Sequence, residues 1–329
     1  MNDQQIMLTE MANGVFAGLG PSATLANDWP QIQELALTSL LLSEEDGGFG
    51  GSWQDAMIVF RLTGYHAVAL PVAEAAIAAR LAAGTDLEGR GTLASRTDGQ
   101  VSGDRFTGTV HGAAFSEGAD FIAAPAPDGE TWLLATSNGE RTAGTNLAGE
   151  ARDVWTFTDA PVVKVAQDVF LLGAFARVAQ IAGALDAALA LSVGYVNDRK
   201  QFGRPLAKFQ AVQQSLATFA CEAAAANCAA MGLAQALDRA GSGGASADFE
   251  AAAAKLRANR AVGVGTSAAH QAHGAIGFTQ DYGLHPITRR LWSARSEFGS
   301  DSHWSALLGT RVAAAGADQF WPNLTALTD

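Results

Sequence analysis

The sequence predicts a mostly α-helical α+β fold in which a small β domain separates two helical regions. The run from Ala67 to Ala83 is rich in alanine and apolar at helical spacing. From about residue 90 to residue 165 the pattern changes to short alternating segments separated by Gly, Asp and Asn, and helical periodicity returns at Asp168. We therefore expect an N-terminal helical domain over 1–82, a middle β domain over 83–165, and a C-terminal four-helix bundle over 166–329.

The N-terminal region should consist of short helices. Pro71 should begin a helix within the alanine-rich run, because proline is well tolerated in a first turn. Between the earlier helices, the segment from Glu44 to Ser52 has the composition of a flexible glycine-rich loop.

The middle region contains short segments typical of strands. Their alternation of polar and apolar residues, with turn residues between them, predicts a small antiparallel β domain. The segments cover residues 103–110, 120–125, 131–136 and 154–158.

The C-terminal region should form long helices over about 168–198, 206–239 and 247–272, with enough alanine to pack closely. Its two cysteines, Cys221 and Cys228, lie seven residues apart and therefore share one helix face. That separation disfavours a disulfide between them. We expect two small buried apolar side chains in a reducing cytoplasm.

Composition bounds the function. The chain has 329 residues, 48% of them hydrophobic, and a formal net charge of −12. This charge argues against general binding to nucleic acid or to anionic membranes. The first residues lack the basic and apolar regions of a signal peptide, and we expect no apolar run able to span a bilayer without charge, so the cytoplasm is the expected location. The six histidines show no spacing typical of a metal site.

The segment from Arg199 to Gln210 reads RKQFGRPLAKFQ and lies where one long helix should end and the next begin. Arg199 offers a fork of donors that suits a pyrophosphate. Gln201 and Gln210 can form hydrogen bonds with phosphate or adenine edges, and Phe202 can stack on a ring. The alternative for each residue alone is an exposed cation or an aromatic anchor in an ordinary helix–turn–helix.

A second segment, from Gln271 to Thr279, reads QAHGAIGFT and follows another long helix. Its small residues let backbone approach a phosphate closely, and Gln271 supplies a directed amide. A glycine-rich bend between helices is the competing interpretation. Arg289 and Arg290, which follow, are expected on a solvated or intersubunit face.

Together these segments resemble the acyl-CoA dehydrogenase family, flavoproteins that oxidise acyl-CoA thioesters between Cα and Cβ. The pattern R-x-Q-F-G-x-P-L-x-x-F-Q matches at Arg199, Gln201, Phe202, Leu206, Phe209 and Gln210. Gln271 and Gly274 match the family's Q-x-x-G-G-x-G-F segment, while Ala275 stands where a second glycine is usual. The resemblance implies that all nine residues contact the ADP side of FAD, and that the glycine-rich loop at 47–51 shapes the mouth of an acyl channel, a plain surface loop being an equal alternative.

The catalytic base implied by the resemblance is harder to place. One family position for this glutamate falls on Phe298 in an ungapped count, with Glu297 one residue away. The other falls on Gly173. Glu297 is therefore the candidate base, and a surface or ion-paired glutamate is the alternative, because a one-residue slip on a helix turns a side chain by about 100°.

In the family, two segments of the β domain cradle the flavin ring. This sequence has no clear counterpart of either segment, and Trp155 to Thr158 is a poor substitute. In the family dimer one subunit holds the flavin ring and the base, and its neighbour supplies the ADP contacts. The sequence thus predicts a subunit of a heteromeric acyl-CoA dehydrogenase, of α2β2 type, that completes the FAD site of a related partner. Steroid side-chain dehydrogenases of this kind imply a bulky acyl group, and an electron-transfer flavoprotein is the implied acceptor. A self-sufficient homomeric enzyme using Glu297 and a non-redox acyl-CoA-binding scaffold remain alternatives.

Overall fold

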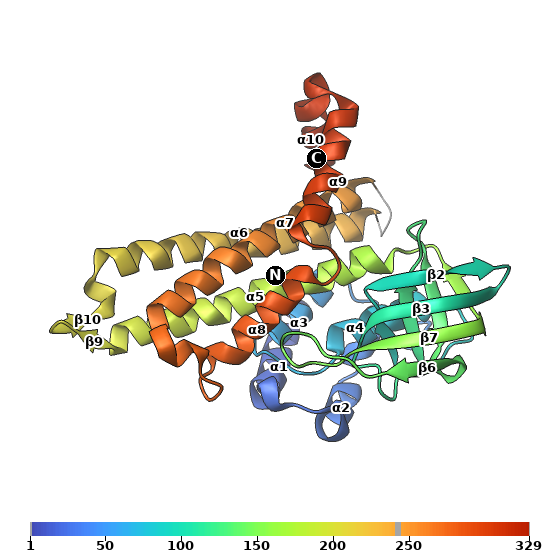
Figure 1. Cartoon of the computed structure of the whole chain (residues 1–329), viewed down its shortest axis with the longest axis horizontal. Helices are drawn as coiled ribbons and strands as arrows, with labels where there is room; N and C mark the ends of the chain where they lie inside the picture. Colours follow the sequence, from blue (N-terminus) through green and yellow to red (C-terminus); the bar gives the residue numbers. More distant parts are fainter. Residues whose placement is uncertain (1, 241–244, 329) are drawn as a thin grey trace.

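A computed structural model describes residues 2–240 and 245–328 of the chain. Helices fill one side of the molecule and two β-sheets fill the other (Figure 1). Local capping fixes the first helices: Asn2 and Gln5 form a capping box at the first helix, and Ser52 and Asp55 form another at the third. The N-terminal helices are α1 (Asp3–Leu19), α2 (Leu25–Glu34), α3 (Trp53–Tyr65) and α4 (Val72–Ala82).

The residues between the helical regions form two four-stranded sheets, in the orders β1-β4-β5-β8 and β2-β3-β7-β6. Phe106, Trp132 and Phe157 pack between the sheets in a separate core. The expectation of a purely antiparallel domain is wrong at one ladder, because β1 pairs parallel with β4. The strands are β1 (Gly91–Leu93), β2 (Arg96–Ser102), β3 (Arg105–Ala114), β4 (Phe121–Pro125), β5 (Thr131–Ala135), β6 (Gly139–Thr142), β7 (Arg152–Pro161) and β8 (Val163–Val165).

The C-terminal helices share one hydrophobic core with the N-terminal helices. Two glycines allow α3 and α5 to pack backbone against backbone. A Cβ built on Gly64 would lie 2.0 Å from the carbonyl oxygen of Gln180, and one on Gly183 would lie 1.8 Å from that of Arg61. The bundle helices are α5 (Val169–Asp198), α6 (Gln210–Ala240), α7 (Ala245–His273) and α8 (Leu284–Ser296).

The helix α6 is covered on one side only. Both α5 and α6 are long and apolar enough for a membrane span by length and composition alone, although a charged residue, Asp186 in α5 and Glu222 in α6, interrupts each apolar stretch. The apolar window of α5 is 83% buried in the bundle, whereas that of α6 is 33% buried. Cys221 and Cys228 lie on the uncovered side and are exposed, so the expectation of buried cysteines is wrong. Helical periodicity predicted that the two cysteines share one face of α6, but not which face of α6 the rest of the chain covers.

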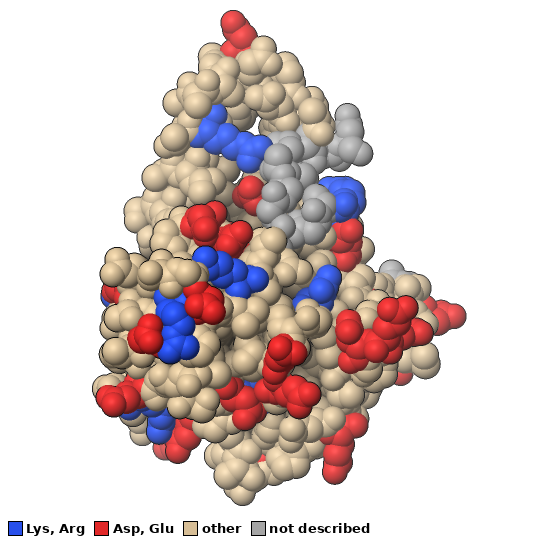
Figure 2. All heavy atoms as spheres, turned by 90° about the vertical axis from the view of Figure 1, so that its right-hand side faces the viewer, with Lys and Arg blue, Asp and Glu red and all other residues tan. Residues whose placement is uncertain are grey.

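The last helices, α9 (Asp301–Ala315) and α10 (Phe320–Thr328), project away from the bundle (Figure 1). Trp304 anchors the start of α9, because its side chain is buried and its indole N–H donates to the carbonyl oxygen of Phe298 at 3.1 Å. The face at the β-sheet end of the molecule carries many carboxylates (Figure 2), consistent with the acidic composition.

Candidate functional site

The connection from α5 to α6 forms a hairpin that extends from one end of the bundle (Figure 1). Its strands are β9 (Lys200–Gln201) and β10 (Arg204–Pro205). Phe202 and Gly203 make the turn between them, with φ angles of 51° and 79°. Two successive residues at positive φ are typical of a tight type I′ hairpin turn. The turn leaves the Phe202 side chain 90% exposed at the tip.

The candidate nucleotide-contacting residues of the hairpin are positioned by their backbone and by ring contacts. The N–H of Leu206 donates to the carbonyl oxygen of Arg199 at 2.9 Å. The Phe209 ring lies 6.1 Å from Phe202, edge to face, and 4.2 Å from the guanidinium of Arg204. Arg199, Gln201 and Gln210 are exposed, and the described chain gives their side chains no hydrogen-bond or ion-pair partner.

The second candidate segment lies at the C-terminal end of α7. Gln271, Gly274 and Ala275 are exposed, and Gly274 ends the helix at a φ of 64°. The rings of Tyr195 and His273 stack at 4.6 Å, which joins the ends of α5 and α7. The structure therefore places both candidate segments at one end of the bundle, although they line separate hollows of about 850 and 560 Å³.

The two positions at which the resemblance places a base are in direct contact inside the molecule. Phe298 has a φ of 51° and a side chain only 3% exposed. A Cβ on Gly173 would lie 2.3 Å from the Phe298 ring, so that ring occupies the space beside the glycine. Lys255 fixes the turn that carries Phe298, because its buried ammonium donates to the carbonyl oxygens of Ala294 and Gly299, both at 3.1 Å. Burial lowers the pKa of this amine to about 7.

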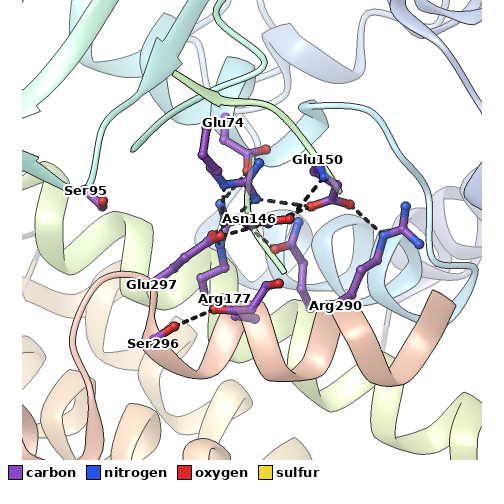
Figure 3. Close-up of polar contacts among 12 residues, drawn as sticks. Glu74, Ser95, Asn146, Glu150, Arg177, Arg290, Ser296 and Glu297 are labelled. Carbon is purple, nitrogen blue, oxygen red and sulfur yellow. Dashed lines mark hydrogen bonds and ion pairs between the residues drawn. The ribbon is translucent and has the colours of Figure 1, made fainter. Parts of the chain in front are cut away.

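Glu297 lies in a buried ion cluster (Figure 3). Its Oε1 accepts from Arg152 Nε at 2.9 Å and from Asn146 Nδ2 at 3.0 Å. Its Oε2 accepts from Arg177 Nε at 2.6 Å and from Arg152 at 3.2 Å. These four hydrogen bonds occupy the acceptor sites of a carboxylate. Burial raises the pKa of Glu297, but Arg152 and Arg177 outweigh it and lower the pKa to about 2.

The cluster continues to both sides of Glu297. Glu74 pairs with Arg177 at 2.7 Å, and Glu150 pairs with Arg290 at 2.7 Å. Arg152 also pairs with Glu150, so the described cluster balances three arginines against three glutamates. The cavity that remains among these side chains is about 50 Å³, which has room for water but not for an acyl chain.

The cluster also joins the β sandwich to the bundle. The loop between β6 and β7 supplies Asn146 and Glu150, and α8 supplies Arg289 and Arg290. Arg289 donates to the carbonyl oxygen of Leu147 at 2.7 Å. Of the solvated or intersubunit face expected for these two arginines, the purely solvated alternative does not hold, because this loop reaches across to α8 and contacts both.

Residues 163–311 match the family model described as acyl-CoA dehydrogenase, C-terminal domain. Acyl-CoA dehydrogenase FadE34 of Mycobacterium tuberculosis is 29% identical over 293 residues, which cover 82% of this chain and 40% of FadE34. Acyl-CoA dehydrogenase IpdE2 of the same organism is 25% identical over 88% of this chain and 90% of IpdE2. Residues 163–311 thus resemble the C-terminal domain of acyl-CoA dehydrogenases, and FadE34 and IpdE2 extend the similarity over most of the chain. The fold agrees with solved members across nearly the whole chain. A chain of the ChsE4-ChsE5 complex of Mycobacterium tuberculosis superposes with a TM-score of 0.83, at 19% identity over 96% of this chain and 99% of that one. The Tcur3481-Tcur3483 steroid ACAD variant gives 0.84, at 20% identity over 95% and 98% of the two chains.

For an acyl-CoA dehydrogenase, the interior of this chain is unusual. The two positions matched to the family's glutamate hold Gly173 and Phe298, neither of which can accept a proton. Glu297, the sequence's candidate, is held as a saturated carboxylate with a pKa of about 2, and such a group is a poor proton acceptor at neutral pH.

The motifs did not reveal Arg152, Arg177 or Glu150, and the sequence placed Arg290 on a solvated or intersubunit face. Arg177 carried a signal, because it is the first charged residue in an otherwise apolar stretch of α5 and a buried arginine needs a carboxylate partner. The partners could not be read from the sequence, since Glu297 lies 120 residues away.

The projecting end of the bundle and the interior therefore differ in what they fit. The exposed Arg199 guanidinium, the amides of Gln201 and Gln271, and the Phe202 ring suit a diphosphate joined to a planar base. A Cβ at Gly274 would meet nothing within 4 Å, so its backbone is open to a ligand. The cavity of about 50 Å³ inside the ion cluster does not fit an isoalloxazine ring together with an acyl chain.

Proposed function

We propose that this chain is one subunit of an FAD-dependent acyl-CoA dehydrogenase and supplies the ADP-side contacts of a cofactor whose flavin ring and catalytic base belong to a related partner subunit. One observation carries the proposal. Gly173 and Phe298 occupy the two positions that the resemblance gives to the base, and the Phe298 ring fills the space beside Gly173. In contrast, Arg199 and Phe202 of the projecting hairpin are exposed. The chain is thus built to contribute to a site outside itself.

In this proposal Arg199 binds the diphosphate through its fork of donors. Gln201, Gln210 and Gln271 orient the phosphates and the adenine edge, and backbone at Gly274 and Ala275 approaches closely. Phe202, Leu206 and Phe209 supply the apolar surface that covers the nucleotide. The flavin, when bound, supplies the hydride-accepting chemistry, and the protein positions it. The part of this chain is to bind and orient.

Two of the structural neighbours support a proposal for the partner and the substrate class. A two-component complex and a steroid-directed enzyme are among the structures that match this fold over nearly its whole length. We propose an α2β2 assembly in the cytoplasm that acts on a bulky, steroid-type acyl-CoA, with an electron-transfer flavoprotein as acceptor. A complex that prefers straight-chain acyl-CoA would contradict the substrate class.

The visible spectrum tests the proposal. The chain purified alone should be colourless, and after co-expression with a related subunit from the same genome the complex should be yellow and should reduce an acceptor with acyl-CoA. A yellow, active chain by itself would instead identify a homomeric enzyme. A complex that stays colourless would identify a scaffold.

A substitution locates the contact. Arg199→Gln should weaken FAD binding by the complex about 10- to 100-fold, because a hydrogen bond to a charged group is worth about 1.5–3 kcal/mol. Arg80→Gln, at an exposed arginine of α4, is the matched control and should leave FAD binding unchanged. Equal FAD affinity of the two variants would remove Arg199 from the site.

A further inference from the structure

The hairpin between α5 and α6 concentrates positive charge at the end of the bundle (Figure 1). From Arg199 to Cys221 the sequence holds four cations and no carboxylate, although the whole chain has a net charge of −12. All four side chains are exposed, and the described residues give them no ion-pair partner, whereas Arg61 and Arg257 pair with carboxylates. Such a group of cations attracts an anionic ligand. The four residues are Arg199, Lys200, Arg204 and Lys208.

Arg204 is positioned by an aromatic ring. Its guanidinium carbon lies 4.2 Å from the centre of the Phe209 ring, within the range of a cation–π contact. The ring of Phe202 meets Phe209 edge to face at 6.1 Å. A guanidinium that lies over a ring keeps the N–H groups at its edge free to donate, and it has lost part of its rotamer freedom before any ligand binds. Arg204 is therefore preorganised to donate to an anion.

The register of the hairpin sets Arg204 beside a candidate nucleotide contact. In the ladder of β9 and β10, Arg204 lies opposite Gln201, and Pro205 lies opposite Lys200. Side chains directly opposite each other in an antiparallel pair share one face. Successive residues of a strand alternate between faces, so Lys200 belongs to the other face. The register therefore places Arg204 on the face of Gln201 and separates it from the neighbouring cation.

We propose that Arg204 is a second diphosphate-binding residue of the hairpin and that, with Arg199, it selects a diphosphate over a monophosphate. Each phosphate of a diphosphate bridge carries negative charge, and one guanidinium fork matches the oxygens of one phosphate. A second fork on the same hairpin can take the second phosphate. Phe209 is then a positioning residue that acts through Arg204. This inference rests on the proposed function and adds a residue that the motif leaves unspecified.

FAD titration of the co-expressed, FAD-free complex tests this role. Arg204→Gln should weaken FAD binding about tenfold, the effect of losing one hydrogen bond to a charged group. Lys200→Gln removes the same charge from the other face of the hairpin and should weaken binding less than about twofold, because salt screens an exposed charge that makes no contact. Equal losses in the two variants would reduce the effect to general attraction and overturn the proposal.

Calorimetric titration of the same complex with ADP, AMP and adenosine separates a phosphate contact from a structural role. The wild-type complex should bind ADP more tightly than AMP. Arg204→Gln should lose most of this preference and bind adenosine as the wild type does, and Arg204→Lys, which keeps the charge but not the fork, should fall between them. A weakened affinity for adenosine would assign the loss to the fold of the hairpin, and an unchanged ratio of ADP to AMP affinity would remove Arg204 from the phosphates. Either result would overturn the proposal.

The Arg199→Gln variant separates this inference from the proposed function. If Arg199→Gln weakens FAD binding and Arg204→Gln does not, the role of Arg204 is wrong and the proposed function stands. If neither substitution changes FAD binding, or if the wild-type complex takes up no FAD, the proposed function fails and this inference fails with it.

Discussion

Substituting Glu297 by Gln separates a structural role from a catalytic one. Gln keeps the shape of the side chain and removes its charge. Arg152 and Arg177 then lose the carboxylate between them, and Gln cannot accept all four hydrogen bonds that Glu297 accepts. If the carboxylate holds the ion cluster together, the variant should be destabilised.

The size of the loss follows from the pKa. Burial raises the pKa of Glu297, but the two arginines outweigh burial and lower this pKa from its ordinary value of 4.5 to about 2. The native state therefore binds fewer protons than the unfolded chain between these values, so the stabilisation is present above pH 4.5 and lost as the pH falls toward 2. The shift corresponds to about 3 kcal/mol at pH 7, falling to about 1.5 kcal/mol at pH 3. Removing one partner of a buried ion pair costs a similar 3–5 kcal/mol.

Urea unfolding of the wild-type chain and of Glu297→Gln, followed by circular dichroism between pH 7 and pH 3, measures this difference. We expect it to shrink as the pH falls. Glu140→Gln, at an exposed glutamate of β6, is the control and should match the wild type throughout. A Glu297→Gln variant with wild-type stability but no turnover in the assembled enzyme would refute the reasoning and restore Glu297 as the base.

Two further predictions concern the turn that carries Phe298. Gly173→Ala should destabilise the chain by about 1–3 kcal/mol in urea unfolding, because the added Cβ would meet the Phe298 ring. Adding Phe298→Leu to this variant should recover part of the loss. Strictly additive effects of the two substitutions would show that the ring is not the obstacle. Lys255→Met should cost about 3 kcal/mol in the same assay, because it removes the buried donor to the Asn259 amide oxygen and to the carbonyl oxygens of Ala294 and Arg295. An unchanged urea midpoint would rule out this role for the amine.

Much of the fold could be predicted because its signals are local. The change from helical periodicity to alternation, and back at Asp168, located the strands β3, β4, β5 and β7 and the helices α5, α6 and α7 within a few residues, but not β1, β2, β6 or β8. The parallel pairing of β1 with β4 was missed, since it joins segments about 30 residues apart and leaves no mark on the pattern of either. The shared core of the N-terminal helices and the bundle was missed for the same reason: it depends on Gly64 of α3 facing the Gln180 backbone and Gly183 of α5 facing the Arg61 backbone.

The outward-facing candidate residues could also be identified from the sequence, because a turn motif such as Arg199 to Gln210 lies in one continuous segment. The contacts of the interior could not be predicted in this way. The ion cluster draws Glu74 from α4, Arg177 from α5, Glu150 from the β6–β7 loop, and Arg290 and Glu297 from α8 and its end. No spacing in the sequence relates these residues.

The sequence by itself determined the long helices and several strands, the acidic character, and the motifs that resemble the acyl-CoA dehydrogenase family, because each rests on residues near one another along the chain. The tertiary structure alone decided that Phe298 fills the space beside Gly173, that Glu297 is a buried ion-pair partner, and that the cysteine face of α6 stays uncovered. Those outcomes depend on which distant segments pack together, and burial, pKa and exposure are set only when they do.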